Sequence, residues 1–435
     1  MNNQKTKPQR LKGFNDFFAK DVKLREFVIN TFKNSFEKYG YEPLETPALE
    51  LTQMMLGISG VEAEKMFYRF KDPGGRDVMM KYEVMTGMAR AVAENINNIK
   101  FPYKRYQIQP VWRSENAQKG RYREFTQCDA DTIGVYNMFY DAEFIGMGLE
   151  IVGKLGFKNY VTKISNRNFL EGLSEVVKLP KELFYEYFIA IDKLLKIGPE
   201  GVIATMQDRG ISKEIAEKTV ALIDPEKYDK MDFASIINGM RKTVGQTEKG
   251  KLGLDELEQI NNYLQLAEID PKLYKFDLSL ARGLASYTGP VWEFEVIDGG
   301  VGSIAGAGRY DKLIEKYIGK EIPATGGSFG IERVCDIIKD RQMMDLGDTT
   351  TEYMLAVYND EMLKPALEIA RKLRDQNKKV MVYPDAIGIG KQLKYADQKG
   401  IPQVIIVAPE EIAQNKVQIK EMKSGESKLV DIKEL

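Results

Sequence analysis

The feature that most limits the fold is a charged, hairpin-like segment at residues 111–127. It reads VWRSENAQKGRYREFTQ, so two runs of strand-forming residues flank a polar turn at residues 116–120. Such a segment predicts two antiparallel strands joined by a short loop. Three guanidiniums should converge from these strands, those of Arg113, Arg121 and Arg123. Arginine suits bidentate phosphate contacts and Phe125 could stack on a base, so the hairpin indicates polyanion binding; a charged surface that only faces water is the alternative.

Histidine is absent from all 435 residues, which removes whole classes of mechanism. A Ser-His-Asp triad, a histidine general base and a histidine metal site all need an imidazole. Catalysis must therefore use carboxylates, arginines, substrate groups or bound cations. The two cysteines, Cys128 and Cys335, are too few and too far apart in sequence for a disulfide framework or a cysteine zinc site. This usage is typical of a reducing cytosol, and we expect a cytoplasmic protein.

Length and charge set further limits. A chain of 435 residues is long enough for two or three domains, at about 100–200 residues each. It carries 63 basic and 64 acidic residues, a net charge of −1, so any contact with nucleic acid must be local. The first residues, MNNQKTKPQR, lack the apolar core of a signal peptide, and no run approaches the roughly 18 apolar residues of a membrane helix. We therefore expect no membrane partner.

The N-terminal part of the chain alternates helix and strand patterns. Apolar residues at three- and four-residue spacing predict a helix over residues 22–39, which Gly40 ends. Residues 41–50, YEPLETPALE, predict a short strand that its two prolines confine to an edge or an interface. A hairpin is expected at residues 67–82 around a glycine turn, and a helix follows from Thr86.

Changes in composition divide the rest of the chain. From residue 171 to 265 helix formers, lysine and glutamate prevail, which predicts an inserted helical module. Strand-like, glycine-rich sequence resumes at Phe276. After a boundary near Leu346, strand and helix patterns alternate from Met354, which predicts a small parallel or mixed α/β domain. The expected divisions are a first domain, a helical insertion and a C-terminal domain, at residues 1–170 with 266–342, 171–265 and 347–435.

A glycine-rich segment, GGSFGIER, occupies residues 326–333. No Walker lysine follows it and no GxGxxG opens a helix, so neither a P-loop nor a dinucleotide fold is supported. The functional interpretation is a strand whose glycines let a flat ligand lie against the backbone, with Arg333 delivered at the start of a helix. A purely structural strand is the alternative.

Five segments in order resemble the class II aminoacyl-tRNA synthetases, and within them the histidyl-tRNA synthetases. They read YEPLETPALE, VWRSENAQKGRYREFTQ, ARGLASYTGPVWEF, GAGRYDKL and GGSFGIERV, while IGKQLKYADQKGIPQVIIV resembles that family's anticodon-binding domain. The resemblance covers nearly the whole chain. It implies an α+β catalytic domain built on an antiparallel sheet, a helical insertion that meets the tRNA acceptor arm, and a C-terminal α/β anticodon-binding domain. YEPLETPALE is similar to the first motif of the class, so a homodimer is implied.

The resemblance also implies roles at the nucleotide end of the site. Arg113 and Arg282 would hold the α-phosphate of ATP and neutralise the charge that develops at phosphorus, which makes them the catalytic residues. The implied ATP-binding residues are Arg113, Glu115, Arg121, Phe125 and Arg333. Phe125 and Arg333 would pack on opposite faces of the adenine. Mg²⁺ would bridge the outer phosphates, with no protein side chain assigned to a metal, and Lys119 in the hairpin turn would meet the tRNA.

A histidine pocket needs carboxylate, phenol and amide partners for the ring nitrogens and the amine. By resemblance, the histidine-binding residues are Glu83, Met85, Gln127, Asp131, Arg282, Ser286, Tyr287 and Tyr310. Met85 stands where the family has threonine, unless Thr86 supplies that hydroxyl. Ala285 and Ser286 also depart from the family pattern, as does Thr126, which stands where many members carry histidine or tyrosine.

The implied function is that of a histidyl-tRNA synthetase. Histidine and ATP would give histidyl-adenylate and pyrophosphate, and the terminal ribose hydroxyl of tRNA(His) would then take the histidyl group. The alternative is a non-catalytic paralogue that regulates histidine biosynthesis or senses uncharged tRNA. Such paralogues typically lose catalytic arginines or the anticodon-binding domain. This chain keeps Arg113, Arg282 and Arg333, which favours the enzyme.

Overall fold

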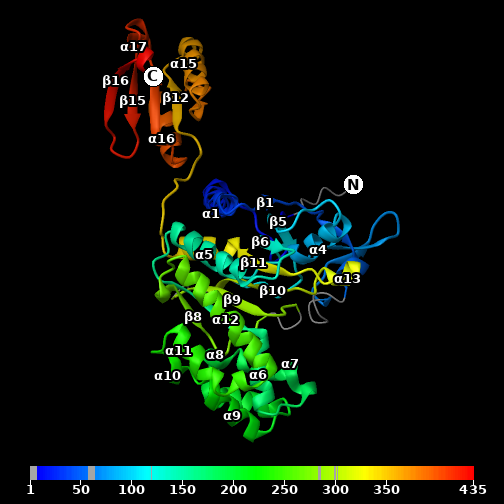
Figure 1. Ribbon diagram of the computed structural model, residues 1–435. Coiled ribbons are helices and arrows are strands. Elements are labelled where there is room, and N and C mark those ends of the chain that lie inside the picture. Colours follow the sequence, from blue (N-terminus) through cyan, green and yellow to red (C-terminus); the bar gives the residue numbers. More distant parts are fainter. Residues whose placement is uncertain (1–6, 57–63, 119, 283–285, 298–299, 301) are drawn as a thin grey trace. The chain divides into compact units, whose positions relative to one another are not determined.

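The computed structural model describes residues 7–56, 64–118, 120–282, 286–297, 300 and 302–435 (Figure 1). The chain forms two compact units. The larger unit includes Phe27–Met343, and the smaller unit joins Asp16–Glu26 to Met344–Leu435. The two are described separately below.

An eight-stranded sheet forms the centre of the larger unit, in the order β1-β5-β6-β11-β10-β9-β7-β8. Its strands are β1 Glu42–Pro43, β5 Tyr103–Trp112, β6 Glu124–Ile133, β7 Tyr160–Asn166, β8 Tyr274–Phe276, β9 Pro290–Val296, β10 Ser303–Arg309 and β11 Ala324–Gly330. The six central strands are antiparallel, as expected. The edge strands β1 and β8 run parallel to their neighbours, so the whole sheet is mixed. Each parallel pair is joined by a long crossover, which parallel pairing requires.

Aromatic side chains fill the core between the sheet and two helices, α1 Ala19–Lys38 and α5 Met138–Lys154. The Phe329 ring on β11 lies 4.8 Å from that of Phe32 and 5.1 Å from that of Phe294, measured between centroids. Gly40 ends the α1 segment with a φ of 79°, close to the predicted helix end. This apolar layer covers one face of the sheet and leaves the polar residues of β6 on the other.

The single strand expected at residues 41–50 is wrong, because the structure divides this segment between two sheets. β1 joins the large sheet, whereas β2 Leu49–Leu51 belongs to a three-stranded sheet of order β2-β4-β3. β3 Arg69–Lys71 and β4 Asp77–Met80 form the predicted hairpin. The short α2 Thr52–Met55 follows β2. Pro43 lies in an edge strand, where its missing N–H costs no ladder hydrogen bond.

Helices make up the described chain between β7 and β8, apart from short turns (Figure 1, green). They are α6 Arg167–Val176, α7 Phe184–Ile191, α8 Leu194–Asp208, α9 Lys213–Ile223, α10 Pro225–Tyr228, α11 Phe233–Arg241 and α12 Glu248–Leu266. α6 runs through residue 171, where the sequence placed the start of the insertion. It begins earlier because the Asn166 side chain accepts hydrogen bonds from the Asn168 and Phe169 N–H groups and so caps the helix.

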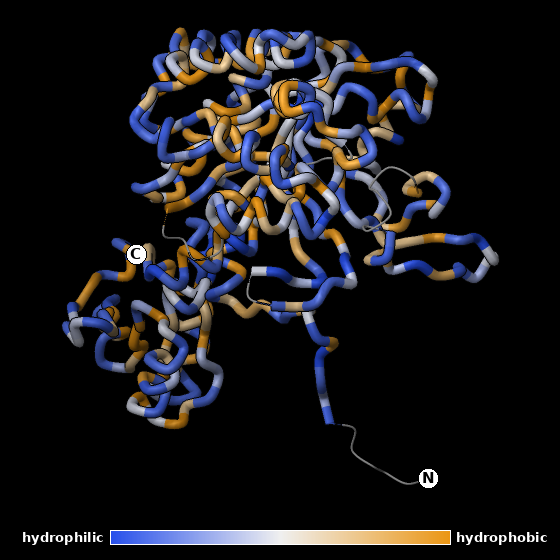
Figure 2. The backbone as a smooth tube through the Cα atoms, turned by 90° about the horizontal axis from the view of Figure 1, so that it is seen from below, coloured by the Kyte–Doolittle hydropathy of each residue, from blue (hydrophilic) through white to orange (hydrophobic). Residues whose placement is uncertain are grey.

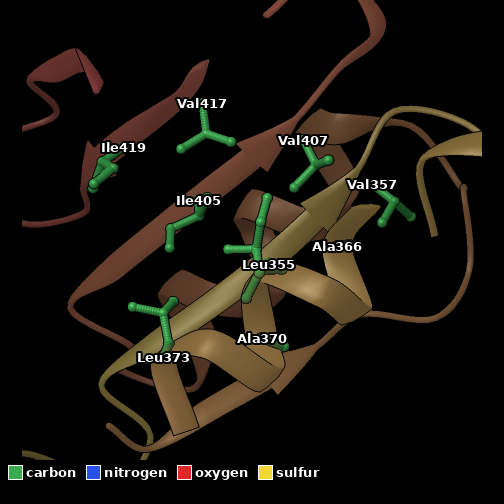
Figure 3. Close-up of a cluster of buried hydrophobic side chains, with 10 residues drawn as sticks. Leu355, Val357, Ala366, Ala370, Leu373, Ile405, Val407, Val417 and Ile419 are labelled. Carbon is green, nitrogen blue, oxygen red and sulfur yellow. The ribbon is translucent and has the colours of Figure 1, made fainter. Parts of the chain in front are cut away.

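The smaller unit contains the predicted alternation of strand and helix. β12 Tyr353–Val357, β13 Val380–Val382 and β14 Gln403–Val407 are parallel, with α15 Leu363–Asp375 and α16 Ile389–Gln398 between them. In Figure 3, Leu355 and Ile405 from the strands meet Ala366 and Ala370 of α15. An antiparallel pair, β15 Lys416–Glu421 and β16 Ser427–Asp431, follows the short α17 Pro409–Ala413 and was not predicted.

Hydrophobic stretches alternate with hydrophilic ones along the described chain (Figure 2). Among the residues that the structure describes, no helix has both the length and the apolar character needed to cross a membrane.

Candidate active site

A cavity of about 600 Å³ opens on the polar face of the large sheet. It is bounded by β6, β10 and β11, by the hairpin turn, and by the starts of α4 Val84–Glu94 and α14 Ile331–Asp340. The predicted site residues that line it are Glu83, Met85, Arg113, Glu115, Arg121, Phe125, Gln127, Asp131, Arg282, Ser286, Tyr287 and Arg333. Tyr310 lies buried behind the wall, and Lys119 and Ala285 fall outside the described residues.

Strand β6 brings three polar side chains to the cavity. Gln127, Asp129 and Asp131 alternate with buried apolar residues, so all three point to the same face of the sheet. The facing strand β11 has glycine opposite Asp131, where a Cβ on Gly326 would lie 2.3 Å from the Asp131 Oδ1. Only glycine permits this approach, which is why a glycine-rich strand forms the adjoining wall.

The hairpin supplies a cationic end. The Arg113 Nε donates to the Tyr82 carbonyl oxygen over 3.0 Å, and its guanidinium lies 4.2 Å from the centre of the Tyr82 ring. The Arg121 Nε lies 3.3 Å from the Glu115 Oε2, and the Arg113 Nη1 lies 3.8 Å from the Glu115 Oε1. One carboxylate thus holds two arginines side by side. These contacts hold the two guanidiniums in place. Because one carboxylate neutralises only one of the two charges, positive charge remains for an anion.

Arg123 does not converge with the other two arginines, contrary to expectation. Its Nε donates to the Glu115 carbonyl oxygen over 2.9 Å, and its N–H donates to the Gly13 carbonyl oxygen. A Cβ on Gly13 would lie 2.7 Å from the Arg123 Cγ, so the two segments pack closely. Arg123 therefore fixes the turn from behind and does not line the cavity.

Arg333 closes the cationic end from the start of α14. Its Nη1 donates to the Ser303 carbonyl oxygen over 2.7 Å and its Nε to the Gly120 carbonyl oxygen over 3.2 Å. Burial lowers the pKa of Arg333, and the neighbouring Arg282 and Arg121 guanidiniums lower it further. Like charges held together in this way favour binding of a polyanion.

Arg282 enters the cavity from the loop before β9 and forms an ion pair with Glu293 on that strand. Gly306 on β10 leaves space for it, because a Cβ there would lie 2.6 Å from the Arg282 Nη1. Burial lowers the pKa of Arg282. An arginine in this position is held by one carboxylate and faces the other guanidiniums.

The opposite end of the cavity is acidic. Glu83 caps α4: its carboxylate accepts from the Met85 and Thr86 N–H groups, each over 2.8 Å, and from the Thr86 hydroxyl. The hydroxyl missing at Met85 is therefore supplied by Thr86. The Gln127 Oε1 accepts from the Val84 N–H over 3.1 Å, which ties β6 to the same cap.

Asp131 is held in a buried ion pair. Its Oδ2 lies 2.5 Å from the Arg105 Nη2, and the Tyr310 hydroxyl donates to its Oδ1. Both Arg105 and Tyr310 are fully buried. Burial raises the pKa of Asp131, and the Arg105 charge opposes that rise. Arg105 lies directly opposite Asp131 in the β5–β6 register. Its charge offsets part of the desolvation cost of burying this carboxylate.

Several site residues were missed from the sequence. Arg105 follows from the register of the predicted hairpin, because the pairing of Val111 with Phe125 that the structure shows, extended along both strands, places Arg105 opposite Asp131. Asp129 shares the face of Asp131 by strand alternation. Glu332, whose carboxylate accepts from the Thr126 N–H over 3.0 Å, gave no local signal, since it acts from a helix distant in sequence.

Comparisons with known proteins agree with these observations over both units. The Histidyl-tRNA synthetase family model matches residues 13–334, and the Anticodon binding domain model matches residues 352–435. The histidine–tRNA ligase of Christiangramia forsetii is 34% identical, over 98% of this chain and 97% of that protein. The ligase of Cytophaga hutchinsonii is 33% identical, over 97% and 96%.

Solved structures have the same fold. A histidyl-tRNA synthetase from Nostoc superposes with a TM-score of 0.87 at 26% identity, over 99% of both chains. A Bacillus halodurans protein described as an ATP phosphoribosyltransferase regulatory subunit/histidyl-tRNA synthetase gives 0.75 at 21% identity, over 89% of this chain and 97% of that chain, which shows a shared fold alone. Given a family match over most of the larger unit and relatives aligned from end to end, the chain belongs to the histidyl-tRNA synthetase family.

Proposed function

We propose that this chain is a histidine–tRNA ligase: it joins histidine to ATP, forms histidyl-adenylate, and transfers the histidyl group to the 3′ end of tRNA(His). The observation that carries the proposal is the charge of a single cavity, whose wall combines a cluster of arginines with a cluster of carboxylates. Such a site fits an anionic nucleotide beside an amino acid with a cationic amine and a basic ring.

In the first step, a histidine carboxylate oxygen attacks the α-phosphorus and pyrophosphate leaves. Negative charge builds on the phosphoryl oxygens, and Arg113 and Arg282 are proposed to stabilise it from two sides. Charge stabilisation by groups already in place is often the largest catalytic contribution. Tyr82 and Glu293 hold these two arginines before substrate arrives, which supports the assignment.

Phe125 and Arg333 are proposed to hold the adenine between them, and Arg121 and Glu115 to contact the terminal phosphate and the base. The Phe125 ring lies 5.1 Å from the Arg113 guanidinium, next to the proposed α-phosphate position. A planar guanidinium packs well on an aromatic base. The two carbonyl contacts of Arg333 fix its plane, in support of this role.

The acidic end is proposed to bind histidine. Glu83 and Gln127 would hold the α-amine, and Asp131, Tyr287 and Tyr310 would surround the ring. Met85 and Ser286 would line the same pocket and contribute less to the binding of histidine. Support comes from the Glu83 cap, whose hydroxyl donor is Thr86, and from the buried ion pair of Asp131.

Mg²⁺ is proposed to bind through the phosphates of ATP. The described residues contain no cluster of three histidine, cysteine or acidic side chains suited to a metal. Glu115 is paired with Arg121, and Glu332 accepts from a backbone N–H. When bound, the ion would neutralise charge on the outer phosphates, while the arginines of the chain act at the α-phosphate.

The second step needs no protein imidazole. The ribose hydroxyl of the tRNA attacks the histidyl carbonyl carbon, and AMP leaves with the bonding electron pair. The chain has no histidine to act as the base, and a phosphate oxygen of the substrate or the leaving group is proposed to take the proton. Lys119, which lies outside the described residues, is proposed to meet the acceptor end. The α/β domain at 347–435 is proposed to read unstacked anticodon bases.

A cytoplasmic homodimer is proposed as the working form. Leu49 and Leu51 of β2 are 45% and 41% exposed, and Phe70 on the same small sheet is 45% exposed. Apolar side chains gathered on an exposed sheet favour a protein interface. Neither cysteine forms a disulfide, which fits a reducing compartment.

ATP–pyrophosphate exchange with each amino acid in turn tests this function. Exchange is expected with histidine alone and should be lost in Arg282→Ala. Arg209→Ala is the matched control, because Arg209 pairs with Glu186 in the helical module and lies outside the cavity. Absence of exchange with every amino acid would instead support a regulatory protein of the same fold.

A further inference from the structure

Asp129 is a second buried carboxylate on the cavity side of β6, beside Asp131. It is 4% exposed and lines the cavity. Within the described structure its Oδ1 has no hydrogen-bond partner. Buried carboxylate oxygens without a donor are rare, because the lost hydration is not replaced. This oxygen is therefore suited to a ligand that brings a donor.

One buried cation serves two buried carboxylates here. The Tyr310 hydroxyl donates to the Asp131 Oδ1, and the Asp131 Oδ2 lies 2.5 Å from the Arg105 Nη2 in an ion pair that lacks hydrogen-bond geometry. Asp129 has the Ser328 hydroxyl as a hydrogen-bond donor and shares the attraction of Arg105. Lys81 is another buried cation, and it donates hydrogen bonds to the Thr46 carbonyl oxygen and the Gln109 side chain. Arg105 is therefore the cation that acts most strongly on Asp129, and it is already paired with Asp131.

The titratable groups around Asp129 come from five parts of the chain. They are Arg105 on β5, Cys128 and Asp131 on β6, Glu83 before α4, Tyr287 in the loop before β9, and Tyr310 after β10. Burial raises the pKa of Asp129 well above that of an ordinary carboxyl group. Arg105 opposes this rise, while Asp131 and Glu83 add to it. The net effect of these groups favours the protonated form of Asp129.

We propose that Asp129 binds the imidazole ring of the substrate histidine and shares one proton with it, so that the pocket selects an amino acid with a basic ring. This inference rests on the proposed function. A protonated carboxyl with a neutral ring, and a carboxylate with an imidazolium, differ only by movement of that proton along one hydrogen bond. No other reactant is needed.

Two physical facts support proton sharing. Imidazole has an ordinary pKa of about 6.5, above that of an ordinary aspartate, and burial raises the pKa of Asp129, so this carboxyl is better able than an exposed one to hold a proton beside a basic ring. Hydrogen bonds between charged partners are about twice as strong as neutral ones. The shared proton would give the Asp129 Oδ1 a hydrogen-bond donor, and it would offset the cost of burying a second carboxylate.

Binding of histidine and of a ring-fluorinated histidine, compared by titration calorimetry, tests this inference. Fluorination nearly keeps the shape of the ring but makes it much less basic. The wild type is expected to bind histidine at least about tenfold more tightly, and Asp129→Asn and Asp129→Ser should each reduce this preference below about threefold. Both variants carry a neutral side chain. Serine is smaller than asparagine, so agreement between the two variants shows that the loss does not come from a poor fit of the amide group.

Asp141→Asn is the matched control. Asp141 is also a fully buried aspartate, but it pairs with Arg309 and Thr325 outside the cavity. It should keep the wild-type preference even if it lowers stability. Equal binding of the two ligands by the wild type, or an undiminished preference in the Asp129 variants, would overturn the inference. Absence of histidine binding to the wild type would overturn the proposed function itself.

Discussion

Replacing Gly306 by alanine should disable catalysis while leaving the fold intact. A Cβ at this position would lie 2.6 Å from the Arg282 Nη1, closer than real Cβ atoms approach any neighbour. The next nearest atoms, at 3.7 and 3.8 Å, also belong to Arg282. The strain is therefore relieved by moving one flexible side chain away from the cavity, and no backbone atom needs to shift.

The magnitudes follow from this geometry. Moving the Arg282 side chain, which is 41% exposed, breaks one ion pair with Glu293 and should cost about 1 kcal/mol of folding free energy. If Arg282 acts at the α-phosphate as proposed, losing this preorganised charge should lower the exchange rate on the order of a hundredfold or more. Histidine-dependent ATP–pyrophosphate exchange measures the rate, and urea unfolding measures the stability.

Two comparisons decide whether Arg282 carries the effect. Gly239→Ala is a matched change, since Gly239 lies on an exposed face of α11 with no atom within 4 Å of its would-be Cβ. It should keep full exchange and gain up to about 1 kcal/mol from helix propensity. The double variant Gly306→Ala with Arg282→Ala should be no slower than Arg282→Ala alone, because both changes remove the same contact. Full exchange in Gly306→Ala, or additive losses in the double variant, would refute the reasoning.

Three further changes probe the buried polar groups. Arg105→Met should lower the free energy of unfolding by about 3–5 kcal/mol, because it leaves Asp131 buried without its cation; adding Asp131→Asn should recover part of that loss in urea unfolding. Thr86→Val should raise the KM for histidine about tenfold without changing the KM for ATP, since it removes the hydroxyl donor of Glu83. Burial raises the pKa of Glu256 on α12, so its contribution is full below the ordinary carboxyl pKa and is lost as pH rises through the raised pKa. Glu256→Gln should lack this loss, and unfolding measured across that pH interval would contradict the argument if both proteins showed the same slope.

The sequence predicted best those elements whose signals are local. The helix at residues 22–39, the hairpin at residues 67–82 and the alternation from Met354 each carry their own periodicity, and the structure contains all three. Arg333 at the start of a helix was also predicted, because the glycine strand and the helix are adjacent in sequence. Local patterns suffice where an element is stabilised by its own residues.

Predictions were wrong where a distant partner decides the outcome. Residues 41–50 belong to two sheets because Pro43 pairs with β5 and Glu50 pairs with β4. Neither pairing partner can be predicted from the segment itself. Arg123 carries the same charge as Arg121, yet a contact with Gly13 turns it away from the cavity. Tertiary contacts override local preference in both cases.

Fold similarity alone does not separate a ligase from a regulatory relative, since a protein described under both names superposes on this chain with a TM-score of 0.75. The separation must therefore come from charge. A binding protein needs a pocket that fits its ligand, whereas an adenylate-forming enzyme also needs positive groups held where charge develops in the transition state. Arg113 and Arg282 are held by Tyr82 and Glu293, contacts that orient each guanidinium before any ligand arrives. Preorganisation of this kind places positive charge before any ligand arrives, and it suits a site that must bind a transition state more tightly than a substrate.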